Sequence, residues 1–493
     1  MGIEAPPRVI VCMRDAEPSR ELLDAIRGGG VLGLLWFREA FAAGAREATV
    51  AGAAARVARL RGEWPAGSSP VFAVDEEGGL IQQLSGLIDE GGRKWVRLPS
   101  ARALGRAGDR SAAFAHGRET GRRLRRVGCD LALAPVVDLD PGIESPVLGT
   151  RCFGSDPELV SALGLAWLEG LASAGVRGCL KHFPGHGATA VDSHVSLPHV
   201  PAGVDLFRHA VPYASIASSW KSALGPAPAV LTAHIVCGAG GLPATLDEGI
   251  LARVPKGLGP ILTDSLDMGA LGACGDLAAR ATTSLRAGAD LLLVGVDLRG
   301  GLALARSIEP VRSERLRAWA PLDPLPPIPE PWQEEEIAKL AAAGLRLTSG
   351  GILPEGEWDW ILPARFGPYG EIASPPPSET TAARRVAHLL RYDADAPESL
   401  LTALRAASAR PALVGVLHRG PIAGGLLGLL RERRWRRERP DRGGLAALAH
   451  LLDEGPEGGV EGLWTIETCG FGEMEMAALR EAWERVGPAG FDD

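Results

Sequence analysis

The feature that most constrains the fold of this chain is a regular alternation of short apolar runs with longer amphipathic segments. Eight runs of aliphatic residues recur along the first part of the sequence: Val9–Met13, Gly33–Phe37, Val71–Asp75, Leu131–Pro135, Gly178–His182, Ala229–His234, Pro260–Asp264 and Ala289–Gly295. They are apolar almost throughout instead of alternating with polar residues, which is typical of strands that are covered on both faces. The pattern therefore predicts a buried parallel sheet.

The segments between these runs have the periodicity of surface helices. The clearest are Ser19–Arg27, Glu39–Arg61, Ala112–Val127, Asp156–Ala174 and Asp276–Ala287. A strand and a helix repeated eight times over about 300 residues favour a closed (β/α)8 barrel over an open doubly wound sheet. We expect an α/β protein in which residues 1–320 form a TIM barrel.

A change of composition marks the end of the barrel. Pro321–Pro331 contains six prolines, which favour a stiff extended connector. A helix-like stretch, Gln333–Leu347, completes a predicted linking segment of residues 321–348. The remainder, residues 349–493, has two strand-like runs, Ala412–His418 and Gly462–Thr468, each followed by helical sequence. It predicts a smaller α/β domain at the C-terminal end.

Charge and cysteine content exclude several classes of protein. The net charge of −8 gives no overall attraction to nucleic acid, and the arginine-rich stretch Arg431–Arg442 is interrupted by acidic residues, as on a solvated helix face. We expect no secretory leader, because the opening residues lack a basic segment followed by a long apolar run, and we expect no membrane helix, because no apolar stretch reaches the roughly 18 residues that one needs. Its seven cysteines are scattered, without CxxC spacing. We expect a cytoplasmic protein with no nucleic-acid or membrane partner.

Ionisable residues stand at the ends of five of the predicted strands or just after them. They are Asp75, Asp138, Lys181, His182, His234 and Asp264. In a TIM barrel the carboxyl ends of all strands meet at one face, where active sites are built. Packing alone does not explain polar residues at so many strand ends, so they predict one shared pocket.

The densest polar segment is KHFPGHGATAVDSH, from Lys181 to His194. His182 and His186 are four residues apart, as metal-binding histidines on a helix can be. Pro184 and Gly185 lie between them and disfavour a common helical face. We predict no metal, with metal binding as the open alternative.

This segment and five others resemble glycoside hydrolase family 3, in particular its bacterial β-N-acetylglucosaminidases (β-N-acetylhexosaminidases). The other five are VDEEGG, LAPVVDLD, RCFGSDPELV, LTAHIV and ILTDSLDMGAL, in the same order along residues 1–320. The resemblance implies a retaining, exo-acting glycosidase that works by double displacement and needs no cofactor. Its expected partner is an amino-sugar glycoside, with a role in peptidoglycan recycling.

The resemblance also assigns roles to residues. Asp264 would be the nucleophile, His194 the acid/base, and Asp192 the carboxylate that orients His194. For the terminal sugar, the resemblance implies that Asp75 accepts hydrogen bonds from hydroxyl groups, while Arg151, Lys181 and His182 donate to it. His234 would line the pocket floor, although a buried hydrogen-bonded histidine is an equal reading.

Three departures from the family pattern leave the substrate open. Gln83 stands at a substrate-binding position where relatives carry arginine, Leu80 replaces a second arginine, and Ala188 replaces an aspartate. A β-glycoside phosphorylase or another family 3 β-glycosidase is therefore the first alternative. A non-catalytic sugar-binding protein is the second, although it would have no need of Asp264, Asp192 and His194 together.

Overall fold

The structure is a computed structural model of the chain. It describes residues 8–42, 48–79, 81–140, 148–189, 193, 196–237, 241–308, 313–319, 324–343, 346–349, 358–361, 385–391, 412–418 and 460–467. These residues belong to two compact units, the first ending at Glu336 and the second beginning at Ile337. The division lies within the predicted linking segment.

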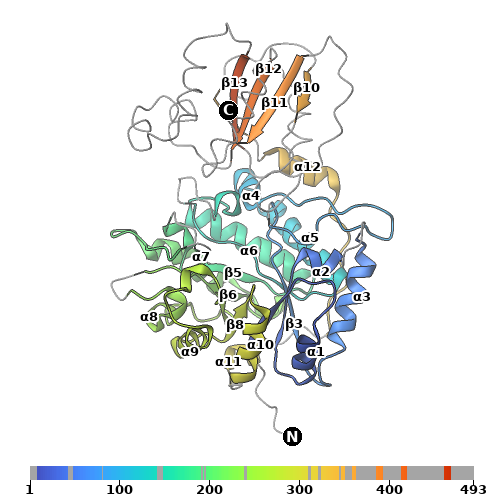
Figure 1. Ribbon diagram of the computed structural model, residues 1–493. Helices are drawn as coiled ribbons and strands as arrows, with labels where there is room; N and C mark the ends of the chain where they lie inside the picture. Colours follow the sequence, from blue (N-terminus) through green and yellow to red (C-terminus); the bar gives the residue numbers. More distant parts are fainter. Residues whose placement is uncertain are drawn as a thin grey trace. The chain divides into compact units, whose positions relative to one another are not determined.

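The first unit contains an eight-stranded parallel sheet that closes into a barrel (Figure 1). Its strands are β1 (Val9–Met13), β2 (Gly33–Trp36), β3 (Val71–Val74), β4 (Leu131–Ala132), β5 (Cys179–Phe183), β6 (Ala229–Thr232), β7 (Ile261–Ser265) and β8 (Leu291–Val294). Their order is β4-β3-β2-β1-β8-β7-β6-β5. Backbone hydrogen bonds from Ala132 to Arg177 and from Cys179 to Ala134, both 2.9 Å, join the segments of β4 and β5. The predicted TIM barrel is confirmed.

Helices follow the strands around the barrel (Figure 1). They are α1 (Arg20–Arg27), α2 (Arg38–Ala42), α3 (Val50–Arg61), α4 (Ala101–Ala107), α5 (Arg110–Val127), α6 (Pro157–Ser173), α7 (Leu206–Ser219), α8 (Glu248–Leu251), α9 (Leu277–Ala287), α10 (Leu298–Ser307) and α11 (Glu314–Ala318). Side-chain caps set several of their starts, since Asp156 precedes α6 and Asp276 precedes α9. None of the helices in the described part of the chain is both long and apolar enough to cross a membrane.

One predicted helix is wrong. The segment Glu39–Arg61 contains two helices, α2 and α3, and Thr49 between them is extended, with φ −107° and ψ 152°. The Thr49 side chain accepts a hydrogen bond from the Gly52 backbone N–H, so this residue caps α3. Helical periodicity persists on both sides of such a cap, which is why the pattern alone did not reveal the break.

Alternate residues of the strands fill the barrel interior. Their cluster is Ile10, Leu32, Leu35, Val71, Ala73, Leu131, Leu133, Cys179, Ala229, Leu231, Leu262, Leu291, Leu293 and Trp319. Trp319 reaches this cluster from the residue after α11, and the Arg177 guanidinium lies 4.2 Å from its ring. Arg177 also donates hydrogen bonds to Asp130 and to the Trp319 carbonyl. The Trp319 ring and the Arg177 guanidinium therefore cover the end of the barrel where the strands begin.

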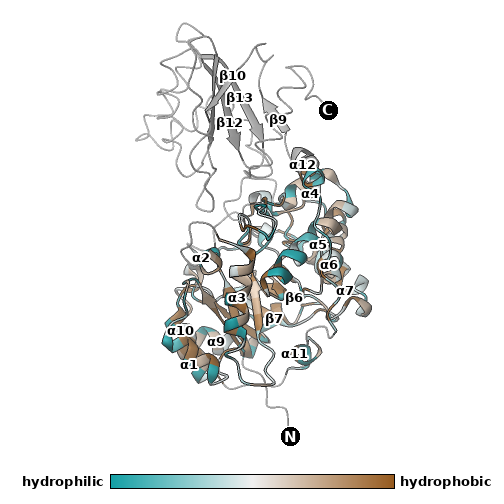
Figure 2. Cartoon of the chain, turned by 90° about the vertical axis from the view of Figure 1, so that its right-hand side faces the viewer, coloured by the Kyte–Doolittle hydropathy of each residue, from teal (hydrophilic) through white to brown (hydrophobic). Residues whose placement is uncertain are grey.

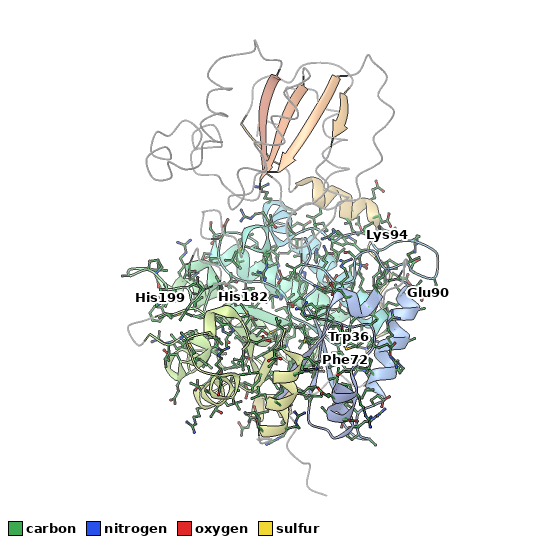
Figure 3. The ribbon with its side chains drawn as sticks, viewed as in Figure 1. Trp36, Phe72, Glu90, Lys94, His182 and His199 are labelled. Atoms are coloured by element: carbon green, nitrogen blue, oxygen red, sulfur yellow. The ribbon has the colours of Figure 1, made fainter. Side chains whose placement is uncertain are left out.

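A second apolar layer lies between the strands and the surrounding helices. Trp36 on β2 stacks on Phe41 of α2, and its ring meets the edge of Phe72 on the neighbouring strand β3 at 6.0 Å (Figure 3). Figure 2 shows that strand β7 is coloured as hydrophobic (brown), whereas the helices outside carry hydrophilic segments (teal). Both faces of the strands are thus covered, as their apolar composition predicts.

A buried histidine on α5 makes the barrel sensitive to acid. Trp167 Nε1–H donates to His116 Nδ1 at 2.8 Å, so His116 must donate from Nε2 to the Pro99 carbonyl at 2.9 Å. Burial lowers the pKa of His116 to about 4, more than the Pro99 carbonyl raises it. The folded protein therefore holds the neutral ring.

The neutral His116 ring should make the stability of the barrel depend on pH. The folded-state pKa of His116 lies below its ordinary value of 6.5. The contribution of the neutral ring to the free energy of unfolding is therefore complete above pH 6.5 and is lost as the pH falls toward 4. Between pH 7 and pH 5 the loss should be about 2 kcal/mol. Urea unfolding of His116→Gln should show a smaller fall over this range than the wild type. The free energy of unfolding of both proteins should be constant from pH 7 to pH 8. Equal losses in acid would show that His116 is not the group responsible.

The second unit contains a five-stranded sheet in the order β10-β11-β12-β13-β9. The strands are β9 (Arg346–Ser349), β10 (Trp358–Ile361), β11 (Arg385–Arg391), β12 (Ala412–His418) and β13 (Val460–Glu467), and only β9 is antiparallel to its neighbour. The helix α12 (Glu334–Ala343) precedes them. Two strands match the predicted runs Ala412–His418 and Gly462–Thr468, while the arginine-rich stretch Arg431–Arg442 lies outside the described residues.

Candidate active site

The segment after β3 brings two carboxylates to the mouth of the barrel. Asp75 and Glu77 follow Val74 directly, and then Gly78 and Gly79 turn the chain with φ angles of +96° and +59°. A side chain at Gly78 is excluded, because its Cβ would lie 2.4 Å from the Pro99 carbonyl oxygen. The two glycines of VDEEGG therefore allow the tight turn after Glu77 that fixes the position of this residue.

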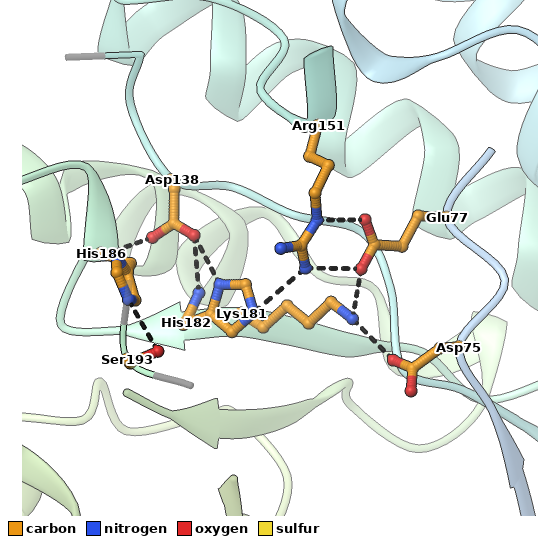
Figure 4. Close-up of polar contacts among 8 residues, drawn as sticks. All are labelled: Asp75, Glu77, Asp138, Arg151, Lys181, His182, His186 and Ser193. Atoms are coloured by element: carbon orange, nitrogen blue, oxygen red, sulfur yellow. Dashed lines mark hydrogen bonds and ion pairs between the residues drawn. The ribbon is translucent and has the colours of Figure 1, made fainter. Parts of the chain in front are cut away.

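Glu77 is the centre of a buried cluster of charges (Figure 4). Its two oxygens accept hydrogen bonds from Nε and Nη2 of Arg151, each at 2.8 Å, in a bidentate pair. Lys181 Nζ lies 2.5 Å from Glu77 Oε1 and 2.8 Å from Asp75 Oδ1. Residues from three separate loops and strands thus meet at one point.

The charges in this cluster stabilise one another. Burial alone would raise the pKa of Glu77, but Arg151 and Lys181 lower it to about 2. Burial likewise disfavours the charged form of Lys181, yet Asp75 and Glu77 raise its pKa above the ordinary value. Each group therefore stays ionised at neutral pH, and the cationic hydrogen-bond donors keep fixed positions.

His182 lies between this cluster and Asp138 (Figure 4). Its Nδ1 is 2.6 Å from Asp138 Oδ2, and its Nε2 is 3.3 Å from Arg151 Nη2. Because Arg151 can only donate, Nε2 is an acceptor and Nδ1 carries the proton. Burial opposes ionisation of Asp138, but His182 and His186 outweigh it and lower its pKa. Asp138 thus fixes the His182 ring and its tautomer.

Asp264 lies near the end of β7, at the same face of the barrel. Its Oδ1 accepts a hydrogen bond from the Ser265 backbone N–H at 2.7 Å, and Oδ2 has no protein donor among the described residues. Burial raises the pKa of this carboxyl, but His234, His182 and Lys181 together with the Ser265 N–H bring it below its ordinary value. Asp264 is therefore a carboxylate with one oxygen available to a ligand.

His234 is buried behind Asp264. Its Nε2 donates to the Ser265 carbonyl at 2.9 Å, and its Nδ1 lies 2.8 Å from Thr245 Oγ1. Of the two predicted roles, these contacts fit the buried hydrogen-bonded histidine. It also stands first among the charges that lower the pKa of Asp264, so it both positions the β7 backbone and stabilises the carboxylate.

The predicted acid/base residues Asp192 and His194 lie outside the described residues, but Ser193 between them is described. His186 Nε2 lies 3.1 Å from Ser193 Oγ (Figure 4), and the Ser193 carbonyl accepts a hydrogen bond from Ala270 N–H at 3.2 Å. Ala270 follows β7 in the short helix η5 (Gly269–Leu271). The loop after β5 is thus fastened at Ser193 to the loop that follows Asp264.

Gln83 binds other residues of the protein. Its side-chain oxygen accepts a hydrogen bond from the Arg38 backbone N–H at 3.0 Å, at the start of α2, and its backbone N–H donates to the Glu76 carboxylate at 2.6 Å. Arg38 in turn donates to the Gln82 and Ser85 carbonyls at 2.7 Å. The amide oxygen at the position of the missing arginine therefore joins α2 to the segment after β3.

Sequence reasoning missed a clamp next to Asp264. Ser265 Oγ donates to Asp267 at 2.6 Å, and Asp267 accepts from the backbone N–H groups of Val296 and Asp297 at 2.8 and 2.5 Å. The spacing of Ser265 and Asp267 after a predicted strand end is the signal that could have indicated it. The clamp joins the ends of β7 and β8.

No group of three or more His, Cys, Asp and Glu side chains within the described ranges is arranged to hold a metal ion. The ring centroids of His182 and His186 are 6.0 Å apart. Asp138 accepts hydrogen bonds from the His182 ring and from the His186 backbone N–H. The six described cysteines are all free thiols.

Comparison with known sequences decides the family. Residues 11–303 match the sequence profile of the glycosyl hydrolase family 3 N-terminal domain, which is more than half of the chain. The chain belongs to glycosyl hydrolase family 3. The family predicted from the motifs is confirmed.

Two relatives of known name are similar to this chain in sequence. A β-hexosaminidase of Bordetella avium is 34% identical over 270 residues, which cover 52% of this chain and 73% of the relative. One of Alkalilimnicola ehrlichii is 35% identical over 235 residues, covering 45% and 64%. The chain thus spans slightly less than two thirds of the second relative.

Solved structures of family 3 proteins are also similar. NagZ of Neisseria gonorrhoeae, in complex with N-trifluoroacetyl-D-glucosamine, has 27% identity and a TM-score of 0.54, over 69% of this chain and 95% of NagZ. A β-N-acetylglucosaminidase of Paenibacillus sp. FPU-7 covers 96% of this chain and 94% of its own, with a TM-score of 0.70. At 22% sequence identity, the similarity to this second structure concerns the fold alone.

Proposed function

We propose that this protein is a retaining, exo-acting β-N-acetylhexosaminidase that hydrolyses terminal amino sugars by double displacement. The observation that carries the proposal is the pairing of an ionised Asp264, with one oxygen available, and a fixed set of sugar-binding groups at the same barrel mouth. The β-hexosaminidase relatives support the substrate class.

In the first step Asp264 attacks the anomeric carbon and the bond to the aglycone breaks. His194, protonated at the start, gives a proton to the departing oxygen and becomes neutral, while Asp192 holds the ring and stabilises its charged form before the transfer. In the second step His194 takes a proton from water, which attacks the same carbon and releases Asp264. Two inversions at that carbon give net retention.

Asp75, Arg151, Lys181 and His182 bind the terminal sugar in this proposal. Asp75 accepts from sugar hydroxyl groups, while Lys181 and Arg151 donate to them from positions fixed by Glu77. A preorganised set of donors costs little reorganisation on binding, so these contacts can favour the distorted ring of the transition state. We place the enzyme in the cytoplasm, on amino-sugar fragments such as those of peptidoglycan.

A chromogenic panel tests the proposed function. The wild-type protein is assayed on aryl β-N-acetylglucosaminide, β-glucoside and β-xyloside, each with and without inorganic phosphate, and the sugar product is identified. We expect the N-acetylglucosaminide to be cleaved fastest, with free sugar as product. Preference for the glucoside or xyloside would replace the substrate class, a glycosyl phosphate would indicate a phosphorylase, and no turnover would indicate a sugar-binding protein.

The acid/base assignment predicts a dependence on the leaving group. His194→Ala should slow cleavage of alkyl or sugar aglycones by about a hundredfold or more, because their oxygen must be protonated as it leaves. A nitrophenyl aglycone leaves without that help and should be slowed far less in the glycosylation step. Single-turnover rates on both substrates are the measurement. Equal slowing would argue against His194 as the acid.

A further inference from the structure

The strand ends next to Asp264 form a surface that the proposed mechanism does not use. In the sheet order, β8 follows β7, and β1 and β2 come next. All four strands are parallel, so the residues after them share the barrel mouth with Asp264. These residues include Arg14 after β1, Phe37 after β2 and Val296 after β8.

Arg14 is mounted on this surface by two contacts. Its guanidinium carbon lies 3.6 Å from the centroid of the Phe37 ring, and its Nε and Nη2 donate to the Gly295 carbonyl at 3.4 and 3.2 Å. Gly295 in turn donates its N–H to Ser265 Oγ at 2.5 Å. Only Gly295 and Ser265 therefore separate the guanidinium from the residue that carries the attacking carboxylate.

The contacts leave one edge of the guanidinium available. Within the described parts of the chain Arg14 has no ion pair, and its Nη1 has no acceptor, while the side chain is exposed. Neighbouring carboxylates do not pair with it, since Asp267 already accepts from Ser265 and from three backbone N–H groups, and Asp297 caps α10. The exposed Asp15 follows Arg14 in sequence without pairing with it. Val296, 67% exposed, provides an apolar neighbour.

Such a group is suited to one kind of partner. A planar guanidinium held against an aromatic face has lost much of its side-chain freedom, and its open edge matches the two oxygens of a carboxylate. In the proposed function the terminal sugar binds over Asp264, and the neighbouring strand ends that carry Arg14 are then available to the group that leaves.

We infer that Arg14, held by Phe37 and Gly295, forms an aglycone subsite that selects substrates with a carboxylate on the leaving group. The inference rests on the proposed glycosidase function and adds the chemical class of the aglycone. A purely structural role, in which Arg14 only joins β1 to β8, predicts altered stability without altered selectivity.

The test compares two substrates that differ in one group. The meta-carboxyphenyl and meta-carbamoylphenyl β-N-acetylglucosaminides present a charged and a neutral aglycone of the same shape. The wild type should favour the carboxylate by about three- to tenfold in kcat/KM, since an exposed but prealigned charge pair is of moderate strength. Arg14→Gln should reduce this ratio to about one and leave kcat/KM for the neutral substrate within about twofold.

A matched variant separates local binding from overall charge. Arg299 is exposed in the first turn of α10, after β8, and Arg299→Gln removes the same charge near the mouth without touching Phe37 or Gly295. It should keep the wild-type ratio. A ratio that is unchanged in Arg14→Gln, or lost equally in both variants, overturns the subsite. A wild type that cleaves both substrates without preference does the same, whereas a wild type that cleaves neither refutes the proposed function as well.

Discussion

Replacing Asp264 by asparagine should lower kcat/KM for an aryl N-acetylglucosaminide by about ten-thousandfold or more, because the amide cannot form the glycosyl-enzyme. The substitution keeps the shape of the side chain, so urea unfolding should change much less than activity. The control is Asp276→Asn, in the cap of the helix that follows the same strand, where asparagine can still accept the Ala279 N–H. It should retain near wild-type turnover.

A second measurement on the same position identifies the chemical role. In Asp264→Gly, added azide can occupy the vacated space and attack the anomeric carbon while the aglycone leaves with its electron pair. The expected product is the α-glycosyl azide, formed with a single inversion. A β-azide, or full activity of Asp264→Asn without azide, would show that another group is the nucleophile.

Glu77→Gln should be the most damaging change among the sugar-binding groups. It removes the carboxylate that pairs with Arg151 and Lys181 while both cations stay buried. Leaving buried charges without their partner typically costs about 3–5 kcal/mol, although Asp75 still pairs with Lys181 here, which favours the lower value. We expect a loss of about 3 kcal/mol in unfolding free energy and of about a hundredfold in kcat/KM, as the freed donors lose their alignment.

The same substitution at an exposed pair gives the control for Glu77. Glu63 accepts a hydrogen bond from Arg27 at the same distance of 2.8 Å, at the surface, and Glu63→Gln should barely change stability. The effect at Glu77 should also depend on pH. Its folded pKa of about 2 lies below the ordinary value of 4.5, so its stabilisation is complete above pH 4.5 and declines as the pH falls toward 2. A constant difference from the wild type across that range would contradict the assignment.

The barrel could be predicted from the sequence because its strands are apolar on both faces, which separates each run clearly from the helices around it. The helix break at Thr49 could not, since a capping threonine fits the same periodicity as its neighbours. In the second unit β12 and β13 were predicted, whereas β9, β10 and β11 mix charged and apolar residues and give no continuous run. The length of the continuous apolar run made the difference.

The site shows a similar division. Asp75, Lys181, His182 and Asp264 could be located because a parallel barrel gathers strand ends at one face. The bidentate pair of Arg151 with Glu77 joins segments 74 residues apart, which no local pattern reveals. Gln83 was predicted from its position in a motif, but the three-dimensional structure directs its side-chain oxygen to Arg38. Asp192 and His194 remain predictions.

The bond between Ser193 and Ala270 offers a way to follow the enzyme at work. The Ala270 amide proton is shielded by burial and by the Ser193 carbonyl, so it can exchange with deuterium only when the two loops part. One backbone proton thereby reports how often the loop of the proposed proton donor leaves the strand of the proposed nucleophile. An inhibitor that holds both groups around one sugar would slow that exchange without touching Ala270 itself.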